Sequence, residues 1–361
     1  MRKGVISNKQ LQLLAFTYIL GPFLIFGIGG DLKQDAWIAT ILALVLSIPI
    51  VIIYGKLMNL YPEKNIFNIL EISFGKVFGK ILSILVIFHV FLLGAYILND
   101  FADFTKLTAL FYTPKFIPML IIGTLSIWIL NAGIEVLANW VEFFIRGILI
   151  FIFVIWILLI PQMNAANLQP VFESSLCKIS TESLKIVALP FSELMVFLNF
   201  CDCVKCNKNT CIFVKPLIAA GAIVIIGIIV QIMLLGGEIY STKYYPSYAA
   251  IRRIVFKGDF QRLEIIASVA FTITQFIEFS LCVLGVSKGI QSVFNLENYK
   301  YILVPTIFLV INFSYLMFRS VMEANEFLNL WAVYQIAMQV LFPSIILIVS
   351  LIKKGHFSRL H

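Results

Sequence analysis

Long apolar runs separated by short polar segments dominate the hydrophobic pattern of the chain. The runs at 36–60 and 140–161 lack the period-two alternation of membrane β-strands. About 20 apolar residues in a helix are enough to cross the hydrocarbon core of a bilayer. The pattern predicts ten membrane-spanning helices, at residues 11–30, 36–60, 78–99, 116–132, 140–161, 183–201, 215–237, 264–284, 300–318 and 330–352.

The amino-acid composition supports the same class. Hydrophobic residues make up 61% of the chain and charged residues 13%, whereas a soluble domain is about half apolar and about a quarter charged. A water-soluble core cannot bury such an excess, so we predict an all-α integral membrane protein in a lipid bilayer. The first apolar run has no small-residue cleavage site after it, and we interpret it as a retained span.

The net charge of +8 bears on topology more than on binding partners. In a soluble protein it would suggest nucleic acid, but in a membrane protein it follows the positive-inside rule, so we predict no nucleic-acid partner. Ten spans place both termini on one side, and a modest excess of Lys and Arg favours the cytoplasm. The amphipathic stretch 65–79 is predicted to lie along the membrane surface. The basic segment 238–262 is predicted to be a long extracytoplasmic loop with short helices of its own.

Two of the predicted spans are interrupted by proline. Gly21-Pro22 falls inside the first span and Pro190 inside the sixth, and a proline removes a backbone hydrogen bond that lipid cannot replace. The interruptions occupy similar places in two five-span halves, 1–161 and 183–352, within one domain of residues 1–361. An odd number of spans inverts the second half, and paired interruptions in inverted repeats are typical of transporter-like folds with a central binding site.

Glu193 lies beside the second interruption and points to the chemistry of that site. A carboxylate inside a membrane faces a cavity or a partner; it could receive a ligand's ammonium group, exchange a proton or pair with a structural cation. Amide groups at 22–24 and 192–194 could hold a ligand carboxylate, so an amino acid would suit both groups. The predicted ligand-binding residues are Gly21, Pro22, Phe23, Gly27, His89, Tyr96, Pro190, Phe191, Ser192 and Glu193.

Several polar side chains in the spans allow a structural or a functional interpretation. His89 and Tyr96 share one helix face and either line the cavity or pack within the protein. Glu142 and Arg146 have the spacing of an intrahelical ion pair. A polar set on the eighth span could coordinate sodium, or its threonine could bond its own helix; the set is Thr272, Gln275 and Glu278. A cysteine cluster could be a metal or redox site or could be incidental; it consists of Cys201, Cys203, Cys206 and Cys211.

The sequence carries no phosphate-binding loop and no paired nucleophile and base, so we expect no enzymatic activity and no cofactor. Four segments in order resemble the spore germination permease family, the B subunit of endospore germinant receptors within the amino acid–polyamine–organocation transporter superfamily. They are "ISNKQLQLLAFTYILG" at the start, "QDAWIATIL" at the second span, "PFSELMVF" at the sixth, and "YPSYAAIRRIVFKGDFQRLEII" at residues 245–266.

The resemblance implies a sensor of small nutrient germinants, typically amino acids, in the inner membrane of a dormant spore. It implies a complex with a larger A subunit and a lipoprotein C subunit, and ten helices with the first and sixth broken. Three functions are compatible with these expectations. The protein could bind a germinant and signal to its partners, act as an amino acid symporter, or serve as a scaffold with a vestigial pocket.

Overall fold

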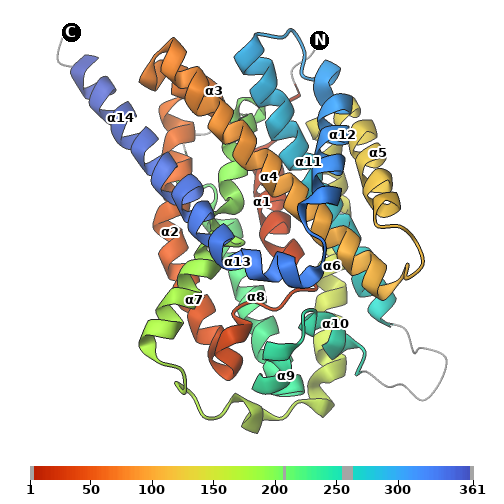
Figure 1. Cartoon of the computed structure of the whole chain (residues 1–361). Helices are drawn as coiled ribbons and strands as arrows, with labels where there is room; N and C mark the ends of the chain where they lie inside the picture. Colours follow the sequence, from red (N-terminus) through yellow and green to blue (C-terminus); the bar gives the residue numbers. More distant parts are fainter. Residues whose placement is uncertain (1–3, 206–208, 254–262, 358–361) are drawn as a thin grey trace.

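The computed structural model describes residues 4–205, 209–253 and 263–357, and over these ranges the chain forms helices and no strand (Figure 1). A single parallel bridge pairs Ile6 with Val204. The long helices are α1 (Asn8–Phe23), α2 (Ala36–Leu60), α4 (Lys76–Thr108), α5 (Phe116–Ala132), α6 (Ile134–Leu159), α7 (Leu176–Ala188), η4 (Phe191–Cys203), α8 (Val214–Leu235), α11 (Leu263–Phe294), α12 (Lys300–Met317), α13 (Val321–Ile336) and α14 (Phe342–Phe357). Shorter elements are η1 (Gly30–Asp35), α3 (Ile66–Phe74), η2 (Ile160–Gln162), η3 (Ala165–Leu168), α9 (Gly237–Thr242), α10 (Pro246–Ile251) and η5 (Ala337–Leu341).

Eight helical segments of the described residues are long and apolar enough to cross a bilayer. The predicted class of an all-α membrane protein is confirmed at this level. The predicted fourth span corresponds to α5, a shorter apolar helix of 17 residues, and the first to α1, which has 16. α1 begins and α14 ends at the same end of the bundle, and α9 and α10 lie at the other end (Figure 1).

Burial separates inner helices from outer ones. In their most apolar windows α11 and the α7–η4 pair are each 83% buried, whereas α6 and the α13–α14 pair are each 28% buried. α11 packs most extensively against α4. Large apolar side chains on α6 and α12, such as Phe143 and Leu316, point away from the protein and suit contact with lipid. The polar chemistry is therefore concentrated around α1, α4, η4 and α11.

The first interruption lies later in the chain than predicted. α1 continues through Gly21 and Pro22 and ends at Phe23, and residues 24–29 then leave the helix. The reason is that Pro22 deletes only its own N–H, while Leu24 N–H still donates to Gly21 O at 3.1 Å. The expectation of free amide groups at 22–24 is therefore wrong, because this segment is the carboxyl end of a helix, where carbonyl groups are left unpaired.

The second interruption is where the sequence predicts it. α7 ends at Ala188, Leu189 is extended with φ −138° and ψ 112°, and η4 begins at Phe191 with Pro190 as its N-cap residue. η4 covers 13 residues but is kinked at Phe200 (φ −138°, ψ 25°), so it consists of two shorter helical pieces. A continuous 3-10 helix seldom exceeds three or four residues. The N–H groups of Ser192 and Glu193 lie in its first turn, where no intrahelical acceptor is available.

The other irregular segments also have local causes. The predicted loop 238–262 contains α10 and most of α9, as expected, and residues 254–262 lie outside the described ranges. In the predicted tenth span, the π-helical segment η5 separates α13 from α14. α3 corresponds to the predicted amphipathic stretch and packs against α4 and α14.

Candidate functional site

Glu193 is buried where α1, η4, α4 and α11 meet. Its residue is 4% exposed, and its carboxylate interacts electrostatically with side chains from the three neighbouring helices, namely Tyr18, Tyr96, Asp100, Glu278 and Cys282. The hydroxyl of Tyr18 lies 3.4 Å from Cys282 Sγ, and its ring packs edge-on against Phe197. α1 and η4 therefore meet beside Glu193, as the paired interruptions predict.

A second carboxylate, Glu278 on α11, packs directly against α1. A Cβ atom placed on Gly21 would lie 1.8 Å from Glu278 Oε1 and 3.0 Å from Thr274 Cβ. Glu278 Oε2 accepts a hydrogen bond from Gln275 Nε2 at 3.1 Å, but Glu278 Oε1 is buried without a donor. The absence of a side chain at Gly21 thus makes room for the carboxylate.

The charges of these two carboxylates are not compensated by the described part of the chain. No Lys, Arg or His nitrogen in these ranges lies within 4.0 Å of Glu193 or Glu278, whereas Asp103 at the outer end of α4 pairs with Lys115 at 2.8 Å. Buried charges in proteins are normally paired or bind a metal. Two buried carboxylates without a cationic partner in these ranges would therefore suit a cationic group or protons.

His89 and Tyr96 share a helix face, as predicted, and both contact the last span. His89 is fully buried, and its Nε2 lies 3.5 Å from Gln339 Nε2. The ring of Tyr96 stacks on Trp331 at 5.8 Å with an interplanar angle of 18°. His89 is thus packed and hydrogen-bonded within the protein, which is the alternative to the interpretation that it lines a cavity.

A polar network joins the start of η4 to the π-helical segment of the last span. Ser192 Oγ donates to Gln339 Oε1 at 2.7 Å, and Gln339 Nε2 donates to Gln335 Oε1 at 2.7 Å. The hydroxyl of Tyr54 lies 3.0 Å from Ser192 O and 2.5 Å from Gln339 O. π-helical turns are rare and occur mostly at functional sites, and here one is connected to the broken helix.

Two of the predicted ligand-binding residues lie in other surroundings. A Cβ on Gly27 would lie 2.6 Å from Pro246 Cγ, so Gly27 packs against α10. The ring of Phe23 packs against Gly227 of α8. Tyr240 holds the segment after α1, because its hydroxyl donates to Ile28 O at 2.7 Å and lies 3.0 Å from Ile28 N. These contacts connect the end of α1 and the segment after it to α8, α9 and α10, whereas Gly21 lies beside the carboxylate of Glu278.

Aromatic side chains close the bundle near α9 and α10. Phe104 lies 5.2 Å from Tyr245 and 4.9 Å from Phe271 between ring centroids, and Phe26 lies 5.5 Å from Tyr245. Asp103, the residue before Phe104 on α4, pairs with Lys115 and also accepts from Asn99 Nδ2 at 3.0 Å. We call this group the outer aromatic cluster.

The opposite end is closed by an ion pair and by the amino-terminal segment. Lys288 Nζ lies 2.7 Å from Asp202 Oδ1 and 2.8 Å from Cys203 Sγ. Ile6 N–H donates to Cys203 O at 2.8 Å, and Lys205 N–H donates to Ile6 O at 3.0 Å. Side chains and backbone therefore join η4, α11 and the start of the chain at the end that carries both termini.

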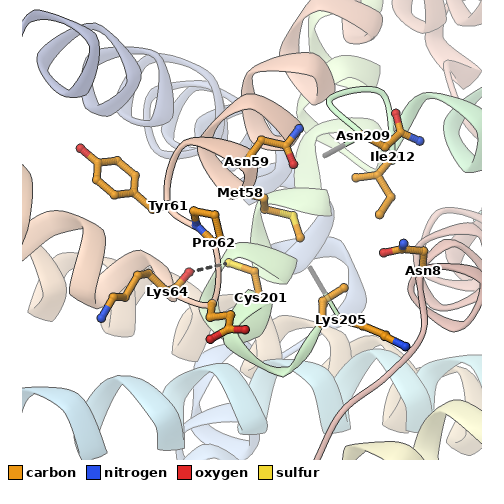
Figure 2. Close-up of a pocket in the computed structure, with 12 residues that line it drawn as sticks. Asn8, Met58, Asn59, Tyr61, Pro62, Lys64, Cys201, Lys205, Asn209 and Ile212 are labelled. Carbon is orange, nitrogen blue, oxygen red and sulfur yellow. Dashed lines mark hydrogen bonds between the residues drawn. The ribbon is translucent and has the colours of Figure 1, made fainter. Parts of the chain in front are cut away.

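The cysteine cluster is spread over different partners. Cys201 Sγ donates to Lys64 O at 3.3 Å and lines a cavity of about 20 Å³ at the end of α2 (Figure 2). Cys203 contacts Lys288, Cys211 is exposed, and Cys206 lies outside the described ranges. Within those ranges no group of three or more metal-ligating side chains is found.

The remaining predicted polar residues have local partners. Glu142 Oε1 lies 3.8 Å from Arg146, which confirms the spacing argument, but only 2.6 Å from Lys9 Nζ. Thr272 donates to Ser268 O at 2.8 Å in its own helix, as the structural interpretation expects. Gln275 bonds Glu278.

Sequence reasoning missed the contribution of the last span. Trp331, Gln335 and Gln339 are spaced four residues apart, and all three are buried. Trp331 Nε1 and Gln335 Nε2 are buried donors without an acceptor in the described part of the chain. Polar residues at that spacing within an apolar span were the signal that could have revealed this face.

Comparison of the sequence with known proteins identifies the family of this chain. The chain matches the family described as "Spore germination protein" over residues 5–327. It belongs to the spore germination protein family. Spore germination protein KB of Bacillus subtilis (strain 168) is 24% identical over 363 residues, which cover 98% of this chain and 96% of that protein. The putative spore germination protein YfkT of the same strain is 23% identical, covering 88% of this chain and 87% of that protein.

The fold of this spore germination protein is similar to that of a transporter. The structure of Mhp1, a nucleobase-cation-symport-1 family transporter in a closed conformation with bromovinylhydantoin bound, superposes with a TM-score of 0.66 at 14% identity. The match covers 96% of this chain and 78% of Mhp1. The likeness to Mhp1 shows that the two proteins share a fold.

Proposed function

We propose that this spore germination protein is the germinant-binding membrane subunit of a germinant receptor. The observation that carries the proposal is the pair of buried carboxylates, Glu193 and Glu278, which have no cationic partner among the described residues and lie where α1 meets η4. Ten spanning helices arranged as two inverted five-helix repeats, at 1–161 and 183–352, would give the two interruptions their common depth. The termini would face the cytoplasm of the spore, below its inner membrane.

The proposed ligand is an amino acid or a similar small nutrient. Glu193 would receive its ammonium group, since a charged hydrogen bond in a dry site favours such a pair. The first-turn amides of η4, at Ser192 and Glu193, would hold its carboxylate. The amides after Gly21 are withdrawn from this role because the end of α1 uses them.

The signal would arise from a change in the relative position of α1 and η4. The outer aromatic cluster and the Lys288–Asp202 pair lie at opposite ends of the bundle, so in this proposal the structure would represent an occluded state. A ligand shifts such an equilibrium only by its differential affinity for the two states. An A subunit and a lipoprotein C subunit would respond to the shift.

Germination of spores tests the proposal. Spores that carry Glu193→Gln as their copy of this protein should lose the response to those of the twenty standard amino acids that trigger the wild type, or need about 10- to 100-fold more, because one charge-assisted bond is worth about 1.5–3 kcal/mol. Glu326→Gln, at an exposed carboxylate on α13, is the matched control. An unchanged response in the Glu193 variant would contradict the proposal.

Active transport is the second candidate, favoured by the likeness to Mhp1 and by the two carboxylates that could exchange protons. Proteoliposomes that contain only this chain distinguish it. Uptake of labelled amino acid driven by a proton or sodium gradient would favour a symporter. Loss of germination in Glu193→Gln spores with an intact receptor complex would exclude the third reading, a scaffold with a vestigial pocket.

A further inference from the structure

An apolar cavity lies away from the carboxylates, between the end of α1 and helices α6, α8, α10 and α11. It offers about 50 Å³ of water-sized space. Its lining carries no charged side chain, and aromatic and aliphatic groups such as Phe151, Ile155 and Trp156 form most of it. Gln231 and Ser247 are its polar members. The lining therefore suits an uncharged, mainly apolar occupant.

The orientation of the Gln231 amide follows from its neighbours. Ser247 Oγ donates to Phe23 O at 3.0 Å, a carbonyl at the carboxyl end of α1 that has lost its helical donor. The hydroxyl proton of Ser247 is used there, so its oxygen accepts from Gln231 Nε2 at 2.9 Å. Gln231 Oε1 then remains on the other side of the amide, buried and without a donor, in a residue that is 5% exposed.

We propose that this cavity binds an apolar molecule with one hydroxyl or amine proton, which it donates to Gln231 Oε1. A buried carbonyl-type oxygen without a donor is unfavourable, so the site selects a ligand that supplies one. A saturated hydrocarbon chain fills the space but leaves the oxygen unpaired. A charged ligand finds no counterion in the lining.

The position of the cavity gives such a ligand an effect on α1. Phe23 lines the cavity with its side chain and is held through its carbonyl by Ser247. An occupant therefore stabilises the described end of α1, where the helix is interrupted. This inference does not depend on the identity of the ligand near Glu193, because the two sites share no side chain.

Fluorescence quenching tests the proposal with two isomers. In nanodiscs that hold the full chain, 6-bromo-1-hexanol and 1-bromo-5-methoxypentane are compared, since only the first has a proton to donate. The Trp156 signal is obtained by difference from Trp156→Phe. It is normalised to the signal of Trp128, which is 61% exposed on α5 and reports the concentration in the membrane. We expect the alcohol to quench Trp156 at a concentration at least 10-fold lower than the ether.

Gln231→Leu should abolish the difference between the isomers, while Gln162→Leu, at an exposed position, should keep it. Equal quenching by the isomers in the wild-type protein would overturn the proposal, and that comparison needs no variant to fold. A difference between the isomers that persists in Gln231→Leu would also overturn the proposal. Competition by 1-hexadecanol but not by 1-hexanol would identify a membrane lipid as the source of the hydroxyl. Competition by 1-hexanol would identify a small solute as that source.

Discussion

At the scale of single residues, glycine allows a carboxylate to pack against the backbone of α1. Gly21 leaves room for Glu278, whose Oε1 would lie 1.8 Å from a Cβ at that position. Glu278 is therefore held by packing against α1 and by Gln275. The carboxylate occupies the space that a side chain at position 21 would need, so this contact requires glycine there.

Gly21→Ala should lower the free energy of unfolding by about 1–3 kcal/mol, because the added methyl group overpacks a closed site. Gly147→Ala is the matched control, since a Cβ there has no neighbour within 4 Å and alanine favours a helix. Thermal unfolding in detergent measures both. Adding Glu278→Ala should recover part of the loss, and a Gly21→Ala protein as stable as the control would refute the packing account.

At the scale of helices, the start of η4 and the π-helical segment of the last span form one unit. Gln339 accepts from Ser192 and donates to Gln335, and Tyr54 approaches the carbonyl groups of both Ser192 and Gln339. A movement of η4 therefore changes hydrogen bonds to the last span as well. The network would offer a physical route from the proposed ligand site to a helix on the outside of the bundle.

Gln339→Leu should destabilise the protein by about 1–3 kcal/mol, because it leaves Ser192 and Gln335 without their partner in a buried place. Combined with Ser192→Ala, the two effects should be less than additive, since both remove the same bond. Asn312→Leu, whose side chain bonds only its own helix, is the control. Fully additive effects in thermal unfolding would show that the two side chains act independently.

Hydrophobic runs predicted the helices well because each span must be apolar by itself. The second interruption was also predictable, since Pro190 cannot continue a hydrogen-bonded helix. Two other features could not be predicted from the sequence. Pro22 was expected to end α1, but its missing N–H affects one bond while the later turn is kept by Leu24. The side chain of Ser192 donates to Gln339, which lies 147 residues away, and no local pattern specifies a contact of that kind.

At the scale of the whole molecule, different kinds of contact close the two ends of the bundle. Aromatic rings close the end near α9 and α10. At the other end Lys288 is buried against Asp202, with side chains 6% and 12% exposed, and Ile6 pairs with Val204. The proposed germinant site would lie between these two ends, as it would in a protein that alternates between states.

Lys288→Met should cost about 3–5 kcal/mol, because it leaves the buried carboxylate of Asp202 without this cation. Lys33→Met is the control, since the Lys33–Glu238 pair is exposed and should contribute at most about 1 kcal/mol. With the other cysteines replaced by serine, Cys203 should become reactive to maleimide in the Lys288 variant only. Equal stability and equal labelling in the two variants would mean that the pair does not hold this end closed.

The most direct test of the central claim is ligand binding by the purified protein. The melting temperature is measured with each of the twenty standard amino acids, for the wild type, Glu193→Gln and Glu326→Gln. A ligand at 100 times its dissociation constant adds about 2.7 kcal/mol to stability. The account predicts that at least one amino acid raises the melting temperature of the wild type and of Glu326→Gln but not of Glu193→Gln. A rise of the same size in all three proteins would contradict it.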